Sequence, residues 1–392
     1  HWYPASDMRH GFLRSLWLLF ATAVIWRWPL PWRSFVYRPG RPALTWTARR
    51  SVNAADAADG GVESRLVSAI AAGEAAEIQD FLVSGGADVN LPNKNGQIAV
   101  VAAAISGDSS IVEMLLAANA DVDARNANGV SAIVAASHLG HYEVVEKLIQ
   151  ARCDVDSVNK AGATALVAAA EGGQLAVVEL LLEAEANVNH VGAMQSTPLF
   201  AAVQEGHETI VSLLLKNNAE PNHVAANGAS ALAVAAQLGF ANVASSLLQS
   251  NAMVDYQNEQ VMNASALVQS SQQGHVDMVE VLLAAKASVD LPCSDGATAL
   301  ILASQVGHQA VVSKLLAARA DPNRGRNDGG TALMFAAQEG HLKVAKQLLT
   351  AGADAMACAA SGATAVSLAA RNQDKAMLRC LMAAGKDAPF DL

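Results

Sequence analysis

The sequence predicts an all-α solenoid in which about ten helix–turn–helix units, each of about 33 residues, stack side by side. The first observation is a repeated string, which reads SAIVAASHLGH from Ser131, TALVAAAEGGQ from Thr164 and TALILASQVGH from Thr298. The second is that each string is followed by a second apolar stretch with helical spacing. A fixed period of about 33 residues is typical of stacked repeats and not of a globular catalytic domain.

One unit illustrates the elements in order. Gly162 can adopt positive φ and closes a tight turn. Thr164 then stands where an N-cap hydroxyl is expected, directly before the apolar run ALVAAA. The glycine pair at 172–173 ends this first helix. In the second helix, Val178 and Leu181 share one face, and this face can be buried only by stacking on a neighbouring unit.

Charge is unevenly distributed along the 392 residues, whose formal net charge is −10. Residues 1–50 carry eight arginines and a single acid, Asp7, so the remainder carries −17. An array this acidic repels phosphate backbones, which makes nucleic acid a poor partner. The four cysteines form no CxxC pair or zinc-type spacing, so we expect free thiols in a reducing compartment.

The head of the chain differs in composition from the rest, since all six tryptophans precede residue 47. The apolar run from Leu16 to Trp26 is too short to span a bilayer comfortably. Residues 8–32 are compatible with a targeting or anchoring sequence, and the alternative is a head with no such role. We therefore divide the chain into a basic segment with a linker (residues 1–61) and a repeat array (residues 62–392).

The repeat resembles the ankyrin repeat, with close matches in TPLFAAVQEGH (Thr197–His207) and GADVN (Gly86–Asn90). The resemblance covers about ten units over residues 62–392. It implies helix–turn–helix units joined by β-hairpin loops, and a protein-binding function. It also implies hydroxylation as one modification of the asparagines at the V-N position of the hairpins, which are Asn90, Asn189, Asn222 and Asn323.

The chain departs from the family pattern in its first helices. The histidine of the family's TPLH motif is absent throughout, which predicts an array held more by apolar contacts than by polar ties between units. The residue after the second helix should adopt a left-handed conformation. Glycine occupies this position at Gly86, Gly352 and Gly385, asparagine at Asn119, Asn218 and Asn251, and strained residues at Arg152, Glu185, Lys286 and Arg319.

The period slips once, between units six and seven, because Ser230 and Ser265 are 35 residues apart. The two extra residues lie near 255–265. We expect this junction to be the least stable interface of the array.

A column of glutamines is the strongest candidate for a binding site. In five consecutive units the seventh residue after the Ser/Thr cap is glutamine, at the end of the first helix. With helices about 8–10 Å apart, the column spans about 32–40 Å, which suits an extended peptide of about ten residues. Glutamine can both donate to and accept from a peptide backbone, although duplication of one unit also explains the column. The predicted partner-binding residues are Gln204, Glu205, Gln237, Gln272, Gln273, Gln305, Gln338 and Glu339.

Hairpin tips are a second candidate surface, comprising His190, His223, Tyr256, Pro292, Cys293, and a small basic spot at Arg324 and Arg326. The histidines that precede each second helix are expected to be structural, because one per unit at about 10 Å spacing cannot share a zinc ion. These are His141, His207, His275, His308 and His341.

The sequence contains no Walker loop, GxSxG, HExxH or kinase signature. We therefore expect a non-enzymatic scaffold, without cofactor or metal, that binds a protein or extended peptide as a monomeric, cytoplasmic array. The alternatives are an adaptor tethered to a membrane or organelle through residues 8–32, and the interaction module of a larger enzyme or channel.

Overall fold

The computed structural model describes residues 61–84 and 88–384, and within them twenty α-helices form ten consecutive pairs. This confirms the predicted all-α solenoid. The segment 8–32, for which an anchoring role was predicted, lies outside the described residues, as do Gly86 and Gly385. None of the described helices has the length and apolarity needed to cross a membrane.

Each pair is one repeat unit. The first helices of units one to ten are α3 (Val62–Ala72), α5 (Ala99–Ser106), α7 (Ala132–Leu139), α9 (Ala165–Glu171), α11 (Pro198–Glu205), α13 (Ala231–Leu238), α15 (Ala266–Gln273), α17 (Ala299–Val306), α19 (Ala332–Glu339) and α21 (Ala365–Arg371). The second helices are α4 (Ala75–Ser84), α6 (Ser109–Ala117), α8 (Tyr142–Gln150), α10 (Leu175–Glu183), α12 (Glu208–Lys216), α14 (Ala241–Gln249), α16 (Val276–Ala284), α18 (Gln309–Ala317), α20 (Leu342–Thr350) and α22 (Lys375–Ala384).

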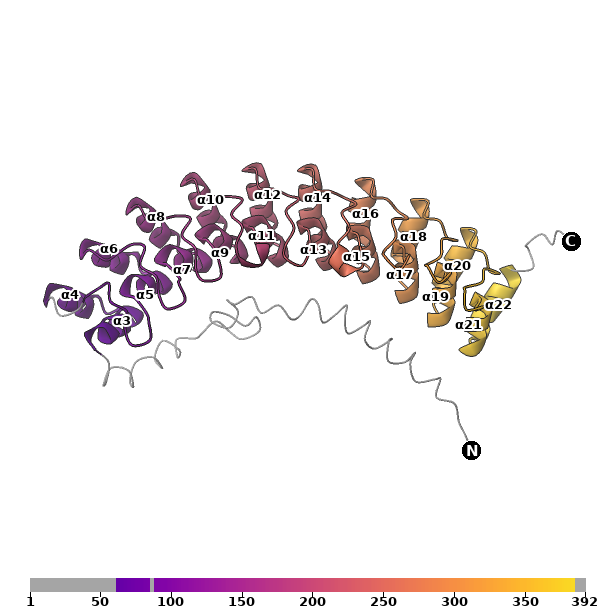
Figure 1. Cartoon of the computed structure of the whole chain (residues 1–392), viewed down its shortest axis with the longest axis horizontal. Helices are drawn as coiled ribbons and strands as arrows, with labels where there is room; N and C mark the ends of the chain where they lie inside the picture. Colours follow the sequence, from indigo (N-terminus) through magenta and orange to yellow (C-terminus); the bar gives the residue numbers. More distant parts are fainter. Residues whose placement is uncertain (1–60, 85–87, 385–392) are drawn as a thin grey trace, which may run out of the picture. The chain divides into compact units, whose positions relative to one another are not determined.

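The helices of the array form two rows (Figure 1). Each first helix packs on the first helix of the next unit, and each second helix packs on the next second helix. Within the array the rows are curved, and the first helices lie on the inner side of the curve. The core is therefore a continuous layer between the rows, with Leu166, Val178 and Leu181 fully buried in unit four.

The sequence determines where the first helices begin and end. The Thr164 hydroxyl accepts a hydrogen bond from the Val167 amide at 3.4 Å, and that of Ser230 accepts one from the Ala233 amide at 3.2 Å. Pro198 follows the cap Thr197, where its fixed φ suits a helix start. Gly206 ends that helix with a φ of 78°, which residues with a side chain rarely adopt.

The hairpin loops between units are short and are tied to one another. Isolated antiparallel bridges, such as Arg125 to Ser131, mark their bases. At the tips, a backbone amide of one hairpin donates to a carbonyl of the preceding hairpin, for example Ala127 to Gly96 at 2.9 Å and Ala360 to Asp328 at 2.9 Å. These bonds form a backbone ladder along the tips.

The left-handed positions agree with the prediction. Arg152, Glu185, Lys286 and Arg319 have φ values of 62°, 62°, 65° and 67°. Asn119, Asn218 and Asn251 lie between 60° and 65°, and Gly352 is at 89°. Four non-glycine, non-asparagine residues are thus held in a conformation that costs about 1–2 kcal/mol each.

Polar ties between units are made by residues other than the missing histidine, and the predicted predominance of apolar contacts stays a prediction. Asn222 donates to the Asn251 carbonyl at 3.0 Å and accepts from the Met253 amide at 2.8 Å. Asn90, Asn189 and Asn323 make the same pair of bonds to the next unit. The asparagines for which hydroxylation was considered are therefore structural ties.

The two extra residues between units six and seven are accommodated at the hairpin tip, in a 3₁₀ turn η2 (Glu259–Val261) followed by Met262 and Asn263 at positive φ. A similar turn, η1 (Ala193–Gln195), occurs in unit five without an insertion. Helices α13 and α15, on either side of the junction, pack as closely as α15 and α17. The low stability predicted for this junction stays a prediction.

Candidate functional site

The glutamine column comprises Gln204, Gln237, Gln272, Gln305 and Gln338, which occupy the same position near the C-terminal ends of α11, α13, α15, α17 and α19. Their side chains are half-buried. The three flanking residues that follow Gln204, Gln272 and Gln338 are exposed, namely Glu205, Gln273 and Glu339. Successive first helices pack together, so the structure places the predicted binding residues along one row.

The backbone of the column is fixed by histidines of the following units. Nε2 of His275 lies 3.1 Å from the Gln237 carbonyl oxygen, and the equivalent contacts of His308 with Gln272 and of His341 with Gln305 are also 3.1 Å. Because a carbonyl oxygen only accepts, this nitrogen carries the proton. The histidines also precede their second helices as N-cap residues, which agrees with the structural role predicted for them.

The geometry of the column is maintained across the insertion. His275 is 38 residues from Gln237, whereas the other histidines are 36 residues from the carbonyl that they contact. The contact distance is nevertheless 3.1 Å in each case. The extra residues therefore displace the hairpin tip and leave the column in register.

Gln338, at one end of the column, differs from the other four glutamines. The Gln338 side-chain amide donates to Glu339 at 3.0 Å, and Asn372 takes the place of the histidine at the Gln338 carbonyl. By contrast, the side chains of Gln204, Gln237, Gln272 and Gln305 make no hydrogen bond to any other described residue. Four consecutive units thus present a half-buried amide whose donors and acceptor are available.

A second row of residues lies three positions earlier on the same helices, and residues at i and i+3 share a helix face. Val234, Gln269 and Phe335 are half-buried there, and Leu302 is 4 % exposed. Val234 and Phe335 therefore place a half-buried apolar side chain beside the column in α13 and α19, whereas α15 has a second amide, Gln269, at this position.

Hairpin-tip residues contact the neighbouring tip. Nε2 of His190 lies 2.9 Å from the Gly162 carbonyl oxygen, and that of His223 lies 3.0 Å from the Gln195 carbonyl oxygen. The Tyr256 hydroxyl donates to Gly228 at 3.0 Å. Their polar atoms therefore serve the stacking of the array.

The two arginines of the predicted basic spot, Arg324 and Arg326, differ in their surroundings. Arg326 forms an ion pair with Asp295 at 2.7 Å and lies over the Phe335 ring, 5.4 Å from its centroid. Arg324 is exposed. Because the guanidinium of Arg326 already contacts Asp295 and Phe335, Arg324 is the exposed arginine of the two.

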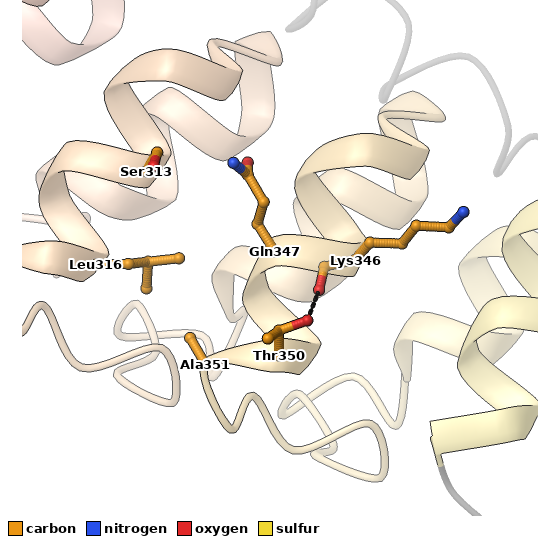
Figure 2. Close-up of a pocket in the computed structure, with 6 residues that line it drawn as sticks. All are labelled: Ser313, Leu316, Lys346, Gln347, Thr350 and Ala351. Carbon is orange, nitrogen blue, oxygen red and sulfur yellow. Dashed lines mark hydrogen bonds between the residues drawn. The ribbon is translucent and has the colours of Figure 1, made fainter.

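A hollow of about 360 Å³ lies between α18 and α20, in the row of second helices (Figure 2). Oε1 of Gln347 is buried without a hydrogen-bond partner, and the Thr350 hydroxyl donates to the Lys346 carbonyl at 2.8 Å. The Lys346 side chain points away from Ser313 and Leu316. Nothing in the repeat pattern predicted this hollow, which is lined by Ser313, Leu316, Lys346, Gln347, Thr350 and Ala351.

Titratable and metal-binding groups are dispersed along the array. Among the residues that the structure describes, no three His, Cys, Asp or Glu side chains gather as a metal site. Burial raises the pKa of the Cys153 thiol to about 12 and that of Cys293 to about 11. Both thiols are protonated near neutral pH, so the nucleophilic thiolate is scarce at either position.

Comparison with known proteins agrees with this architecture. A model of three ankyrin repeats matches six overlapping stretches, which are residues 66–159, 132–225, 193–260, 232–326, 267–358 and 314–390. The chain belongs to the ankyrin repeat family. No curated protein sequence matches it. The crystal structure of the human ASB11 ankyrin repeat domain is similar, with 30% sequence identity and a TM-score of 0.50 over 56% of this chain and 96% of that one.

Ankyrin repeats generally mediate protein–protein interactions. The curved row of first helices and the hairpin tips are two of the surfaces of this ankyrin array. The inner row carries the available amides, whereas the tip residues described above are bonded to one another.

Proposed function

We propose that this ankyrin array is a scaffold that binds an extended segment of a partner protein along the glutamine column. The observation that supports this proposal best is the set of four amides, on Gln204, Gln237, Gln272 and Gln305, that make no hydrogen bond within the described residues. Half-buried polar groups gain from a partner because they are already partly removed from water. An extended backbone supplies the donors and acceptors that they lack.

Preorganisation supports the same surface. The carbonyls of Gln237, Gln272 and Gln305 are held by histidines at 3.1 Å, so the helix ends that carry the amides are fixed before a partner binds. A rigid surface loses little conformational entropy on binding. The affinity is then determined mainly by the cost of ordering the partner segment.

The test uses the full chain and dodecapeptides selected on it from a random display library. Fluorescein-labelled peptides are titrated by fluorescence polarisation against the wild type and against a column variant carrying Gln237→Arg, Gln272→Arg and Gln305→Arg. A matched control carries Gln249→Arg, Ala284→Arg and Gln309→Arg, which add the same charge to exposed positions of the second helices in the same units.

We expect the column variant to weaken binding at least tenfold and the control to stay within about twofold of the wild type. Circular dichroism at 222 nm checks that all three proteins are equally helical. Peptides that bind the column variant as well as the wild type would overturn the proposal and place the binding surface on the tips or the second helices.

A further inference from the structure

The spacing of the glutamine column selects one conformation for its ligand. We infer that the column binds a polyproline II segment and contacts every third residue of it. This inference rests on the proposed function, because it concerns the ligand of the same surface. The observations behind it are the direct packing of successive first helices, the available amides, and the apolar residues Val234 and Phe335 beside the column.

The spacing comes from the helices that carry the glutamines. Each first helix packs directly on the next, and packed helices lie about 8–10 Å apart. The histidine contacts repeat with the same length from unit to unit, including across the insertion before unit seven. A ligand that runs along the column therefore meets an equivalent amide about every 9 Å.

A polyproline II helix has three residues per turn and rises about 3.1 Å per residue, so the same face returns about every 9.3 Å. In a β-strand, every second residue lies on the same face, so equivalent residues are about 6.6 Å apart, and every second one of these is about 13 Å apart. Neither distance matches the spacing of about 9 Å between the glutamines. A strand would present alternate faces to successive glutamines. The polyproline II repeat presents the same face to each.

An α-helix returns a similar face about every 10.5 Å, after seven residues, but its backbone groups are bonded internally. The glutamine amides would then find no backbone partner. A polyproline II backbone makes no internal hydrogen bonds, and its carbonyl oxygens remain available. Gln237, Gln272 and Gln305 can each donate from Nε2 to one such carbonyl.

The row beside the column fits the side chains of such a segment. Val234 and Phe335 are half-buried and apolar, and each lies one helical turn before a glutamine. A proline ring, or another compact apolar side chain, can contact this row while the carbonyl faces the amide. The ligand is therefore a proline-rich or similarly extended peptide whose apolar residues face Val234 and Phe335.

The experiment measures the number of ligand residues per repeat unit. A selected dodecapeptide is resynthesised with lysine at each position in turn. Every version is titrated against full-length chains carrying Gln237→Glu, Gln272→Glu or Gln305→Glu. Each new carboxylate favours lysine at the ligand position nearest to it, so each variant identifies one position by a gain in affinity relative to the wild type.

We expect the three identified positions to be three residues apart, with a gain of at least threefold at each. Proline at the intervening positions should keep the affinity within about threefold. Identified positions two or four residues apart would indicate a strand, and positions seven apart with binding abolished by proline would indicate an α-helix. Either result would overturn the polyproline II assignment, although the column would remain a binding site. Failure of the proposed function would give a different result, because the Gln→Arg column variant would then bind every peptide as well as the wild type does.

Discussion

The imidazole of His308 covers Gly274 of the preceding unit so closely that a Cβ on the glycine would lie 2.6 Å from Nδ1 and Cε1 of the ring. The same ring contacts the Gln272 carbonyl oxygen at 3.1 Å. Gly274 also has a φ of 81°. The glycine of the repeated Gly-His string is therefore required twice, by its own conformation and by the histidine of the next unit.

We expect Gly274→Ala to destabilise the array more than Gly352→Ala. Both glycines adopt left-handed φ, which costs an alanine about 1–2 kcal/mol. A Cβ on Gly352 meets no atom within 4 Å, whereas one on Gly274 must displace His308. Loss of the histidine contact adds about 1 kcal/mol. Urea unfolding followed by circular dichroism at 222 nm measures both, and equal losses would mean that the ring moves away at no cost.

Arg319→Gly should raise the stability of the array. Arg319 has a φ of 67°, and glycine removes most of a strain of about 1–2 kcal/mol while adding some entropy to the unfolded chain. The net gain is about 0.5–1 kcal/mol. The control is Ala318→Gly, at the adjacent residue with a φ of −80°, which should be destabilising. A lower melting temperature for Arg319→Gly would contradict the assigned left-handed position.

Asp290→Asn should add a hydrogen bond between units seven and eight. Asp290 accepts from the Asp321 amide at 3.2 Å but has no donor for the Arg319 carbonyl, whereas Asn323 donates to the equivalent Gly352 carbonyl at 3.0 Å. One added hydrogen bond stabilises by about 0.5–1.5 kcal/mol. Asn323→Asp is the reciprocal variant and should lose a similar amount in the same urea titration. A destabilising Asp290→Asn would show that the carboxylate itself is needed there.

The junction between units six and seven should separate the unfolding of residues 62–261 from that of residues 262–384. There the backbone ladder is replaced by side chains, as Asn258 donates to the Asn227 carbonyl at 3.1 Å and Gln260 to the Ala226 carbonyl at 3.3 Å. Asn258→Ala leaves buried groups without partners, at about 1–3 kcal/mol. In Asn258→Ala we expect two resolved transitions on urea unfolding, and hydrogen exchange over residues 255–275 that is faster than in the rest of the array.

Asn159→Ala is the control for this junction. Asn159 is buried like Asn258, but its tip keeps a backbone bond to the preceding tip, from Lys160 to Asn128 at 3.3 Å. This variant should lower stability without splitting the transition. Uniform protection across residues 255–275 in Asn258→Ala would show that the inner helices alone carry the cooperativity.

Two of the four thiols should react slowly with a disulfide reagent. Cys358 is exposed, whereas burial raises the pKa of Cys153 to about 12 and that of Cys293 to about 11. At pH 8 these two thiols contain about a thousandth or less of their population as thiolate. A double variant with alanine at both positions should lose only the slow phase, and a fast phase of all four thiols would contradict the burial.

The same thiols give the array a dependence on alkaline pH. Their folded-state pKa values lie above the ordinary value of about 8.5. The stability that comes from burying these neutral thiols is therefore fully present below about pH 8.5. It is lost as the pH rises through about 11 for Cys293 and about 12 for Cys153. The alanine double variant should show a smaller fall in stability over that range.

The repeat pattern predicted the helices and their strained ends because these features are local. A cap at Thr164 and a left-handed Arg319 follow from the position of each residue within its own unit. The ties between units could not be predicted in the same way, because each joins positions in different units and depends on stacking geometry. The pairing of Arg326 with Asp295 and Phe335, and the second role of the histidines, belong to this second class.

The candidate site shows the same division. The glutamine column was predicted as a series of residues at one position in the repeat. Its available amides, and the half-buried apolar residues Val234 and Phe335 beside it, follow from how the helices pack in the folded array. The sequence contained only part of this signal, because Gln269 interrupts the apolar pattern three positions before the glutamines, and the exposure of each residue depends on how closely the neighbouring helix packs.

The longer hairpin between units six and seven shows that the inner helices and the hairpin tips can differ independently. This hairpin is two residues longer and has Met262 and Asn263 at positive φ, yet the contact between His275 and Gln237 has the same length as in the next two units. Loop length at a tip is therefore an independent design variable in this scaffold. A longer recognition loop can be grafted at residues 259–263, which would join a second specificity to the same rigid array.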